Sequence, residues 1–450
     1  MKILLLSFYN LGKQPKIIGE LYNKLNIEGT EINVFDYSIN EYDLDLKSYD
    51  AIGIFASMHT ATVLATEYLK DKTLPDKVFT FGLYAKVLSD SDTRITYLEN
   101  LDGSDLEIYL GVNANSNFTI KNSIPDRSPF PEISNYTHLV KGKNKLFTGS
   151  VETTYGCKHS CTHCPVPMQF NGRFKTFSEE KILIDISNQI ESGAQHISFD
   201  DADFFNGPKY SLKILEKLTK KFPSITYDAT IKVEHIIKYQ DYFKELTNLN
   251  MLFITSAFET TNNRVLKILE KNHTYKDLEQ SISISKQYNI DIRPTWMPFT
   301  PWTNLVDLIN IVTLIEHYEL RETVDPIQLT IKLLVPKGSL MLKRPEFKQY
   351  IGEYDQDSFT YLWNYENSKV GNLQALLFRY VAENYGIDEK EQYLELIDII
   401  QSFTNTDIIY NKMYKYHEVP KLSETWFCCA EPNKIQLQRI KSNKALIQEI

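Results

Sequence analysis

Three of the five cysteines in this chain lie within eight residues of one another, at Cys157, Cys161 and Cys164. Thiolates are soft ligands, and a Cys-x3-Cys-x2-Cys run suits an iron–sulfur cluster. Three cysteines leave one iron of a [4Fe–4S] cluster without a protein ligand, and that iron can bind and activate a substrate. A zinc site with His159 or His163 as its fourth ligand is the alternative. A structural disulfide fits less well, because three clustered cysteines cannot all pair among themselves.

The other two cysteines are adjacent, at Cys428 and Cys429. Such a pair can bind a thiophilic centre, form a strained vicinal disulfide, or ligate a second cluster or a metal. Two soft sulfur atoms suit a soft acceptor such as trivalent arsenic. The alternative is a buried apolar pair beside Trp426 and Phe427, since free cysteine packs well in cores. We treat the pair as candidate catalytic residues.

Composition and charge limit the class of protein. The chain has 450 residues, 42% hydrophobic and 24% charged residues, and a formal charge of −9. These values are typical of a globular protein of two or three domains, and the acidic balance argues against a large nucleic-acid surface. No apolar run is long enough to span a membrane. Five cysteines do not form a disulfide framework, so we expect the protein to be located in the reducing cytoplasm.

Strands and helices must position these residues, and they alternate along the first two domains. In residues 1–110 we expect a doubly wound sheet. Its expected strands lie at 3–8, 31–35, 51–56 and 78–83, and its expected helices at 16–25 and 61–69. Residues 111–147 read as a linker. From 148 to 340 the alternation continues, with strands expected at 147–153, 196–199, 226–230, 252–257, 291–296 and 327–334. Residues 341–450 are expected to be helical, over 359–363, 373–384, 389–403 and 407–416, and to end in the Cys-Cys tail.

An acidic run follows the strand expected at 196–199. It contains Asp200, Asp201 and Asp203. Carboxylates at a strand end suit an ammonium group, and three of them in four residues repel one another unless a cation is near. We favour Asp201 for this role, with Asp200 and Asp203 as alternatives. A solvated acidic turn is the other reading.

The cysteine segment, Thr153 to Pro165, resembles the signature of radical S-adenosylmethionine (SAM) enzymes. The resemblance implies that the open iron chelates SAM and that one electron cleaves a carbon–sulfur bond of its sulfonium. It also implies a partial (β/α)6 barrel, with the chemistry at the C-terminal strand ends. The acidic run then stands where many of these enzymes hold the SAM ammonium.

The resemblance implies further SAM contacts. His163 precedes the third cysteine, at a position that lies along the adenine in the superfamily; a solvated loop histidine is the alternative. The remaining candidates face the SAM carboxylate or ribose by resemblance: Lys232, Glu234, Ser256, Glu259 and Arg293. Lys232 could equally be a surface residue.

The segment Cys428-Cys429-Ala430-Glu431-Pro432, near the C-terminus, resembles the tail motif of the CCAEP-tail radical SAM family. Matching blocks span most of the chain, at 12–15, 164–167, 172–174, 228–235, 298–303, 324–328 and 334–339. Radical SAM enzymes of arsinothricin biosynthesis also have cysteine-rich tails, and they transfer the 3-amino-3-carboxypropyl group of SAM to arsenite. The tails differ, so this similarity is distant.

The N-terminal domain resembles the cobalamin-binding domain of a radical SAM subgroup. Its lower-axial signature, Asp-x-His-x-x-Gly, is absent where Asn10 to Pro15 stand. We therefore expect the fold without the usual base-off ligation, and cobalamin as an unlikely cofactor.

The leading hypothesis is a radical SAM transferase that moves a SAM-derived group to a small thiophilic acceptor, such as arsenite, held by Cys428 and Cys429. A 5′-deoxyadenosyl-radical enzyme that uses the pair as a hydrogen-atom or redox relay is the second. The third is a metalloid or redox sensor without turnover. The expected partners are a small-molecule substrate and an electron donor such as flavodoxin or ferredoxin, with no nucleic acid and no membrane.

Overall fold

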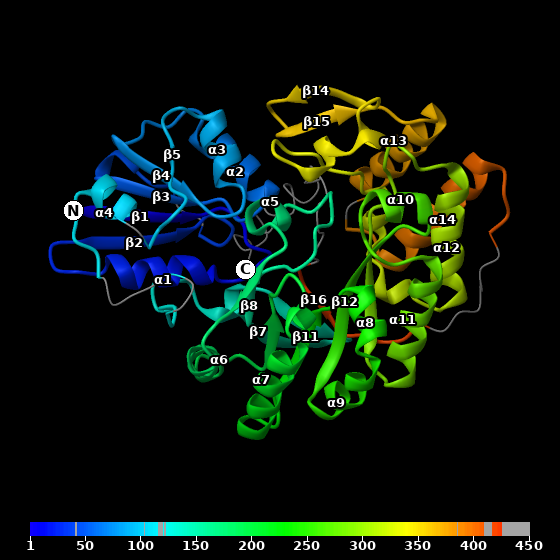
Figure 1. The fold of residues 1–450 in the computed structure, drawn as a ribbon, viewed down its shortest axis with the longest axis horizontal. Coiled ribbons are helices and arrows are strands. Elements are labelled where there is room, and N and C mark those ends of the chain that lie inside the picture. The colour runs from blue at the N-terminus through cyan, green and yellow to red at the C-terminus, as the bar shows by residue number, and fades with distance from the viewer. Residues whose placement is uncertain are drawn as a thin grey trace.

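The computed structural model describes residues 1–40, 43–102, 104–115, 120, 123–384, 386–408 and 416–424. Most strands belong to two sheets, of which Figure 1 shows the first in blue and most of the second in teal and green. No helix among the described residues is both long and apolar enough to cross a membrane.

The N-terminal sheet has five parallel strands in the order β2-β1-β3-β4-β5. Nearly continuous apolar runs form the central strands, because helices bury both faces. Ile3 and Leu5 of β1 pack with α1 and α4, and Leu4 and Leu6 pack with α2 and α3. The elements are β1 (Lys2–Ser7), α1 (Lys16–Leu25), β2 (Glu31–Asp36), β3 (Ala51–Phe55), α2 (His59–Leu69), β4 (Lys77–Phe81), α3 (Ala85–Ser91), β5 (Thr96–Tyr97) and α4 (Ser104–Leu110). The predicted doubly wound fold is confirmed.

The second sheet has seven strands in the order β13-β12-β11-β10-β7-β6-β16. Five are parallel and form an open, curled half-barrel; β6 and β16 extend it antiparallel. Its strands are β6 (His138–Lys141), β7 (Asn144–Val151), β10 (His196–Phe199), β11 (Thr226–Thr230), β12 (Met251–Glu259), β13 (Asp291–Trp296) and β16 (Lys421–Leu422). Its main helices are α6 (Glu179–Glu191), α7 (Pro208–Lys221), α8 (Val233–Lys238), α9 (Phe243–Asn248), α10 (Asn263–Ile268), α11 (Tyr275–Gln287) and α12 (Leu305–His317).

The strand expected at 327–334 is wrong. Residues Pro326–Thr330 form a 3-10 helix instead, and in the described chain this region adds a single isolated bridge to the half-barrel. Pro326 has no N–H to give to a ladder. The Trp296 N–H, at the end of β13, donates to Oε1 of Gln328 at 2.9 Å. A side chain thus takes the hydrogen bond that a strand carbonyl would take.

The C-terminal region is less helical than expected. The stretch 359–363, predicted as helix, forms β15 (Thr360–Trp363), which pairs antiparallel with β14 (Ile351–Asp355). Aromatic side chains favour strands, and Tyr354 packs on Tyr361 across the pair with ring centroids 5.0 Å apart. The helix α13 (Ser368–Glu383) begins five residues before the predicted start at 373, and α14 (Glu389–Thr404) agrees with the prediction to within one residue. Residues 409–415 of the expected last helix lie outside the described residues.

The segment between the sheets is held by a buried ion pair. Arg127 donates to both carboxylate oxygens of Asp185 in α6, at 2.7 and 2.9 Å, and to the Ser150 carbonyl at 3.1 Å. Asp185 is 2% exposed. A buried guanidinium that loses its carboxylate keeps the desolvation cost of its charge and loses the compensation for it.

We expect Asp185→Ala to lower the free energy of unfolding by about 3–5 kcal/mol, because it leaves Arg127 buried and unpaired. Urea denaturation measures this loss. The matched control is Asp90→Ala, which removes the exposed Lys86–Asp90 pair of α3 and should cost at most about 0.5 kcal/mol. Equal losses in the two variants would contradict the structural role of the buried pair.

Candidate active site

The cysteine loop lies just after β8 (Thr154–Gly156), a short strand paired with β9 (Phe174–Thr176), and α5 (Val166–Phe170) follows it. Cys157 and Cys161 are buried, Cys164 is partly exposed, and none of the three forms a disulfide. The Thr162 N–H donates to the Leu269 carbonyl at 3.0 Å, which fixes the middle of the loop.

A side chain from the 3-10 helix Phe204–Asn206, which follows β10, holds the start of the loop. Asn206 accepts from the Lys158 N–H at 3.2 Å and donates to the Gly156 carbonyl at 3.2 Å. Gly156 has a φ of +84°, and a Cβ there would lie 2.4 Å from the Arg173 carbonyl oxygen. Glycine is therefore required where the chain turns into the cysteines.

The electrostatic surroundings of the thiols fit a metal cluster. Burial raises the pKa of Cys157 to about 12 and also raises the pKa of Cys161, whereas Lys271 and Lys232 act in the opposite direction on Cys161. Buried thiolates need a nearby positive charge to compensate for the loss of water, and iron ions provide it. The two lysines offset the remaining negative charge. The three cysteines thus fit a [4Fe–4S] cluster with one open iron.

His163 is 3% exposed, so the solvated alternative is wrong. Its Nε2 lies 3.1 Å from Oε1 of Glu259, and the same oxygen accepts from Lys271 Nζ at 2.9 Å. Burial opposes ionisation of Glu259, but Lys271 and His163 outweigh it and lower its pKa to about 2. The carboxylate at the end of β12 therefore orients the residue that precedes the third cysteine. Contact of either residue with SAM stays a prediction.

The three aspartates of the acidic run have different partners. Asp201 accepts four hydrogen bonds, from the backbone N–H and the hydroxyl of Thr153 and of Thr154, at 2.6–2.9 Å. Burial outweighs these bonds and raises its pKa to about 6. Asp200 pairs with Lys13 of the loop between β1 and α1, whose Nζ also donates to Ser198 at 2.9 Å. Asp201 holds the cysteine loop, and Asp200 joins the two sheets.

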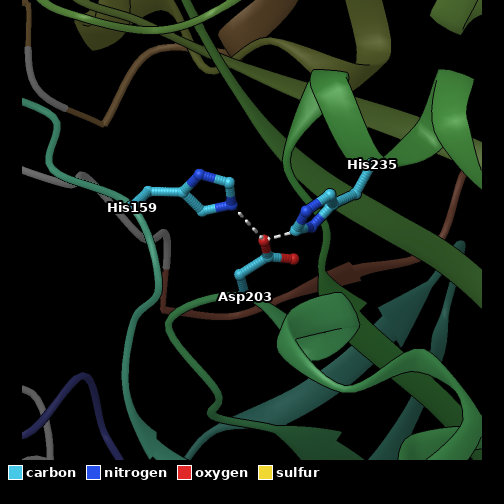
Figure 2. A group of neighbouring side chains, drawn as sticks. All are labelled: His159, Asp203 and His235. Carbon is cyan, nitrogen blue, oxygen red and sulfur yellow. Dashed lines mark ion pairs between the residues drawn. The ribbon is translucent and has the colours of Figure 1, made fainter. Parts of the chain in front are cut away.

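Asp203 lies between two imidazoles, as Figure 2 shows. Its Oδ2 is 3.3 Å from Nε2 of His159 and 2.5 Å from Nδ1 of His235. Burial opposes ionisation of Asp203, but the two histidines outweigh it and hold the pKa of this carboxyl below its usual range. Lys232 Nζ lies 3.1 Å from Nδ1 of His159 and 3.2 Å from Oε2 of Glu234. Lys232 is 7% exposed and is not a surface residue.

The remaining candidates are Ser256 and Arg293. Ser256 of β12 is fully buried. Arg293 of β13 donates to the Glu322 carbonyl at 3.3 Å and lies 3.8 Å from Asp325. Lys421 of β16 also approaches Asp325, at 3.9 Å. The structure thus gathers His163, Lys232, Glu234 and Glu259 near the cysteines and ties Arg293 to a different carboxylate.

Cys428 and Cys429 lie outside the described residues. The chain is described as far as Glu424, whose Oε2 accepts from the Tyr9 hydroxyl at 2.9 Å. A Cβ on Gly12 would meet the Glu424 side chain at 2.5 Å, so the two segments are in close contact. The tail therefore starts beside the loop that carries Lys13.

Three residues of the site were not singled out from the sequence: Lys13, His235 and Lys271. His235 follows β11 and could have been found by grouping polar residues after each parallel strand, since these ends meet at one edge. Lys13 and Lys271 reach the site through long side chains from loops, and no local pattern marks such contacts.

Residues 151–312 match the model of the Radical SAM superfamily. The chain is 26% identical over 150 residues to the ribosomal protein uS12 methylthiotransferase RimO of Pseudothermotoga lettingae, covering 31% of this chain and 34% of that protein. It is 23% identical over 212 residues to an uncharacterized methyltransferase of Pyrococcus horikoshii, covering 44% and 45%. The chain thus spans between a third and a half of these relatives' length.

Two solved structures share the fold over most of the chain. The cobalamin-dependent SAM radical enzyme OxsB, with aqua-cobalamin and SAM bound, matches with a TM-score of 0.65 and 13% identity, over 90% of this chain and 71% of that one. The radical SAM methyltransferase TsrM of Kitasatospora setae, with cobalamin and a [4Fe–4S] cluster bound, matches with a TM-score of 0.54 and 12% identity, over 71% and 73%. The resemblance to radical SAM enzymes and the predicted fold class are confirmed, and the domain with its transferase relatives supports an enzyme.

The expectation that cobalamin is an unlikely cofactor is contradicted, because the two structural neighbours are enzymes with bound cobalamin. The missing histidine between Asn10 and Pro15 excludes only one way of binding the corrin. The switch point of the N-terminal sheet, between β1 and β3, remains the place where such a fold takes its ligand. There Ser57 donates to the Tyr9 carbonyl at 2.7 Å, and His59 lies 2.7 Å from the Ser358 carbonyl, so this histidine is already engaged.

Proposed function

Because residues 151–312 form a Radical SAM domain, we propose that this chain cleaves SAM reductively and transfers a SAM-derived group to a small acceptor. One observation carries the proposal: three cysteines without disulfides, two of them buried, lie on a fixed loop of this domain beside Lys232 and Lys271. Cys157, Cys161 and Cys164 would hold the [4Fe–4S] cluster, which supplies one electron to SAM when bound.

The SAM molecule would lie between the cysteine loop and the ends of β10, β11 and β12. Of the carboxylates there, Asp200 and Glu234 keep the most exposure, 26% and 31% of their side chains. We propose these two for the SAM ammonium in place of Asp201, whose oxygens already accept four hydrogen bonds. Asp200 also pairs with Lys13 and Glu234 with Lys232, but each keeps part of its carboxylate exposed. His163, fixed by Glu259, would lie along the adenine.

The acceptor is proposed to be a small thiophilic molecule, such as arsenite, held by Cys428 and Cys429. The position of Glu424 supports this, because Glu424 contacts the loop whose Lys13 pairs with Asp200. Cys428 follows Glu424 by four residues, and a chain of that length spans at most roughly 14 Å. That distance would allow the pair to lie near the contact between Lys13 and Asp200. The 3-amino-3-carboxypropyl group is the proposed cargo. The proposed electron donor is a flavodoxin or ferredoxin of the cytoplasm.

A second candidate is methyl transfer with cobalamin. The N-terminal sheet with its switch point favours it, together with the cobalamin bound to OxsB and TsrM and the methyltransferases among the relatives. A deoxyadenosyl-radical enzyme and a sensor without turnover remain as further alternatives.

The products that SAM leaves behind separate these functions. Reduced, cluster-loaded protein is incubated with SAM and arsenite, with and without hydroxocobalamin, and the nucleosides are separated by chromatography. We expect 5′-methylthioadenosine, which remains after aminocarboxypropyl transfer. 5′-Deoxyadenosine would instead indicate the adenosyl radical, and cobalamin-dependent S-adenosylhomocysteine would indicate methyl transfer. Absence of all three products would overturn the proposed enzyme and favour a sensor.

A further inference from the structure

Three buried side chains from different elements converge beside the cysteine loop. His159 belongs to the loop itself, Asp203 follows β10, and His235 lies in α8. Their side chains are 9%, 2% and 1% exposed. Figure 2 shows the carboxylate of Asp203 with an imidazole on either side. Charged or polar side chains rarely gather at such depth without a partner that compensates for burial.

The spacing of the three donor atoms fits a single ion. Nε2 of His159, Oδ2 of Asp203 and Nδ1 of His235 all lie within 4.8 Å of one another. A tetrahedral zinc ion at about 2.0–2.1 Å from each ligand would hold them roughly 3.3 Å apart. The separation between His159 and Asp203 is 3.3 Å, and that between His235 and Asp203 is 2.5 Å. Small side-chain rotations would close the remaining differences.

Hydrogen bonding does not account for the three atoms. Each is buried and makes no hydrogen bond of acceptable geometry, although the distances are those of ion pairs. Nearly all buried polar atoms in folded proteins have a hydrogen-bond partner. A cation between the three atoms would satisfy all of them at once.

The surroundings supply a second shell. Nδ1 of His159 lies 3.1 Å from Nζ of Lys232 and 3.7 Å from Oε2 of Glu234, and Lys232 lies 3.2 Å from the same carboxylate oxygen. A metal-binding histidine usually donates its other ring N–H to a carboxylate, which fixes the ring. A metal on Nε2 leaves the proton on Nδ1, so Lys232 would turn from Nδ1 to its other partner, Glu234, and the Nδ1–H would face the same carboxylate. The 31% exposure of the Glu234 side chain opens the group to solvent.

We propose that His159 Nε2, Asp203 Oδ2 and His235 Nδ1 bind one divalent first-row transition-metal ion, separate from the iron–sulfur cluster. Two imidazoles and a carboxylate suit Zn²⁺ or Fe²⁺. Three protein ligands leave at least one coordination position for water or for an anionic oxygen of a substrate. The site goes beyond the proposed function, because its ligands are not those of the cluster and its occupancy is measured without turnover.

The test is a Co²⁺ titration of the full-length, cluster-loaded protein under anaerobic conditions, followed by absorbance and by metal analysis. We expect one Co²⁺ per chain at micromolar concentration, with the visible bands of nitrogen and oxygen ligation. The titration is repeated with the Cys428→Ser/Cys429→Ser variant, in which a sulfur-to-cobalt charge-transfer band should be absent, because no thiolate belongs to the site. Asp203→Asn and His235→Gln should each weaken binding by at least about a hundredfold, and Glu234→Gln by roughly tenfold.

His317→Gln is the matched control, because His317 is exposed at the end of α12, and it should bind Co²⁺ like the natural protein. Iron content and circular dichroism establish that each variant is folded. If Asp203→Asn does not fold, His235→Gln and Glu234→Gln carry the test. No stoichiometric Co²⁺ in the natural protein, a thiolate charge-transfer band in the Cys428→Ser/Cys429→Ser variant, or equal affinity in all folded variants would each overturn the site.

Discussion

Replacing Cys157, Cys161 and Cys164 together with alanine will remove the iron–sulfur absorbance of anaerobically reconstituted protein and all cleavage of SAM. The natural protein should carry about one [4Fe–4S] cluster per chain, since three cysteines of one loop supply all its protein ligands. Nearby Glu259 already accepts from Lys271 and contacts His163, and a carboxylate does not replace three thiolates at a cluster. Iron and sulfide analysis, the visible spectrum and SAM consumption measure the loss.

Ser160→Ala is the matched control for that variant. Ser160 lies on the same loop between two of the ligands, is exposed, and its hydroxyl donates only a long bond of 3.4 Å to Glu270. Its loss should leave cluster content and SAM cleavage unchanged. A triple cysteine variant that keeps its full iron content would show that the cluster is bound elsewhere.

The double variant Cys428→Ser/Cys429→Ser should retain the cluster and bind SAM but form no transfer product. A radical must react within near-contact distance, roughly 3–4 Å, so an acceptor that these sulfurs hold has to lie beside SAM. Serine keeps the size of the side chain but not its affinity for soft centres. Product chromatography measures the loss, and isothermal titration should show that tight arsenite binding disappears with it.

Each single variant, Cys428→Ser or Cys429→Ser, should also abolish product formation if both sulfurs hold the acceptor. A double variant with the turnover of the natural protein would contradict the proposed role, and the pair would then be ordinary packing residues. Loss of cluster together with loss of product would instead place the pair among the cluster ligands.

Sequence periodicity predicted most of the strands, because they are buried parallel strands with short apolar runs. The ranges 196–199, 226–230 and 291–296 agree with the structure to the residue. The strand at 327–334 failed because Gln328 replaces a backbone acceptor, and such a substitution leaves no trace in hydrophobic periodicity. The short run at 359–363 failed because periodicity cannot distinguish a helix from a strand over five residues, although four of them are aromatic or β-branched and favour a strand.

The sequence indicated which types of residue form the candidate site, but not which of these residues contact one another. The acidic run was recognised as one group, yet neighbouring residues of an extended chain point in opposite directions. Asp201 therefore turns to the cysteine loop, whereas Asp200 turns to Lys13, a residue 187 positions away. Pairings over such separations depend on how the two sheets meet. The partners of His235 likewise come from two other elements, although its place after β11 could have been recognised.

The pairing of β16 with β6 affects how the protein is made. The partner of β6 leaves the ribosome some 280 residues after it, a delay of roughly 15–60 s at ordinary rates of synthesis. During that time the edge of the sheet is unpaired and open to wrong partners. The nascent chain can complete its cysteine loop and half-barrel long before Cys428 and Cys429 exist. Synthesis thus orders assembly in time: a cluster can be inserted while the tail thiols are still absent and cannot compete for iron.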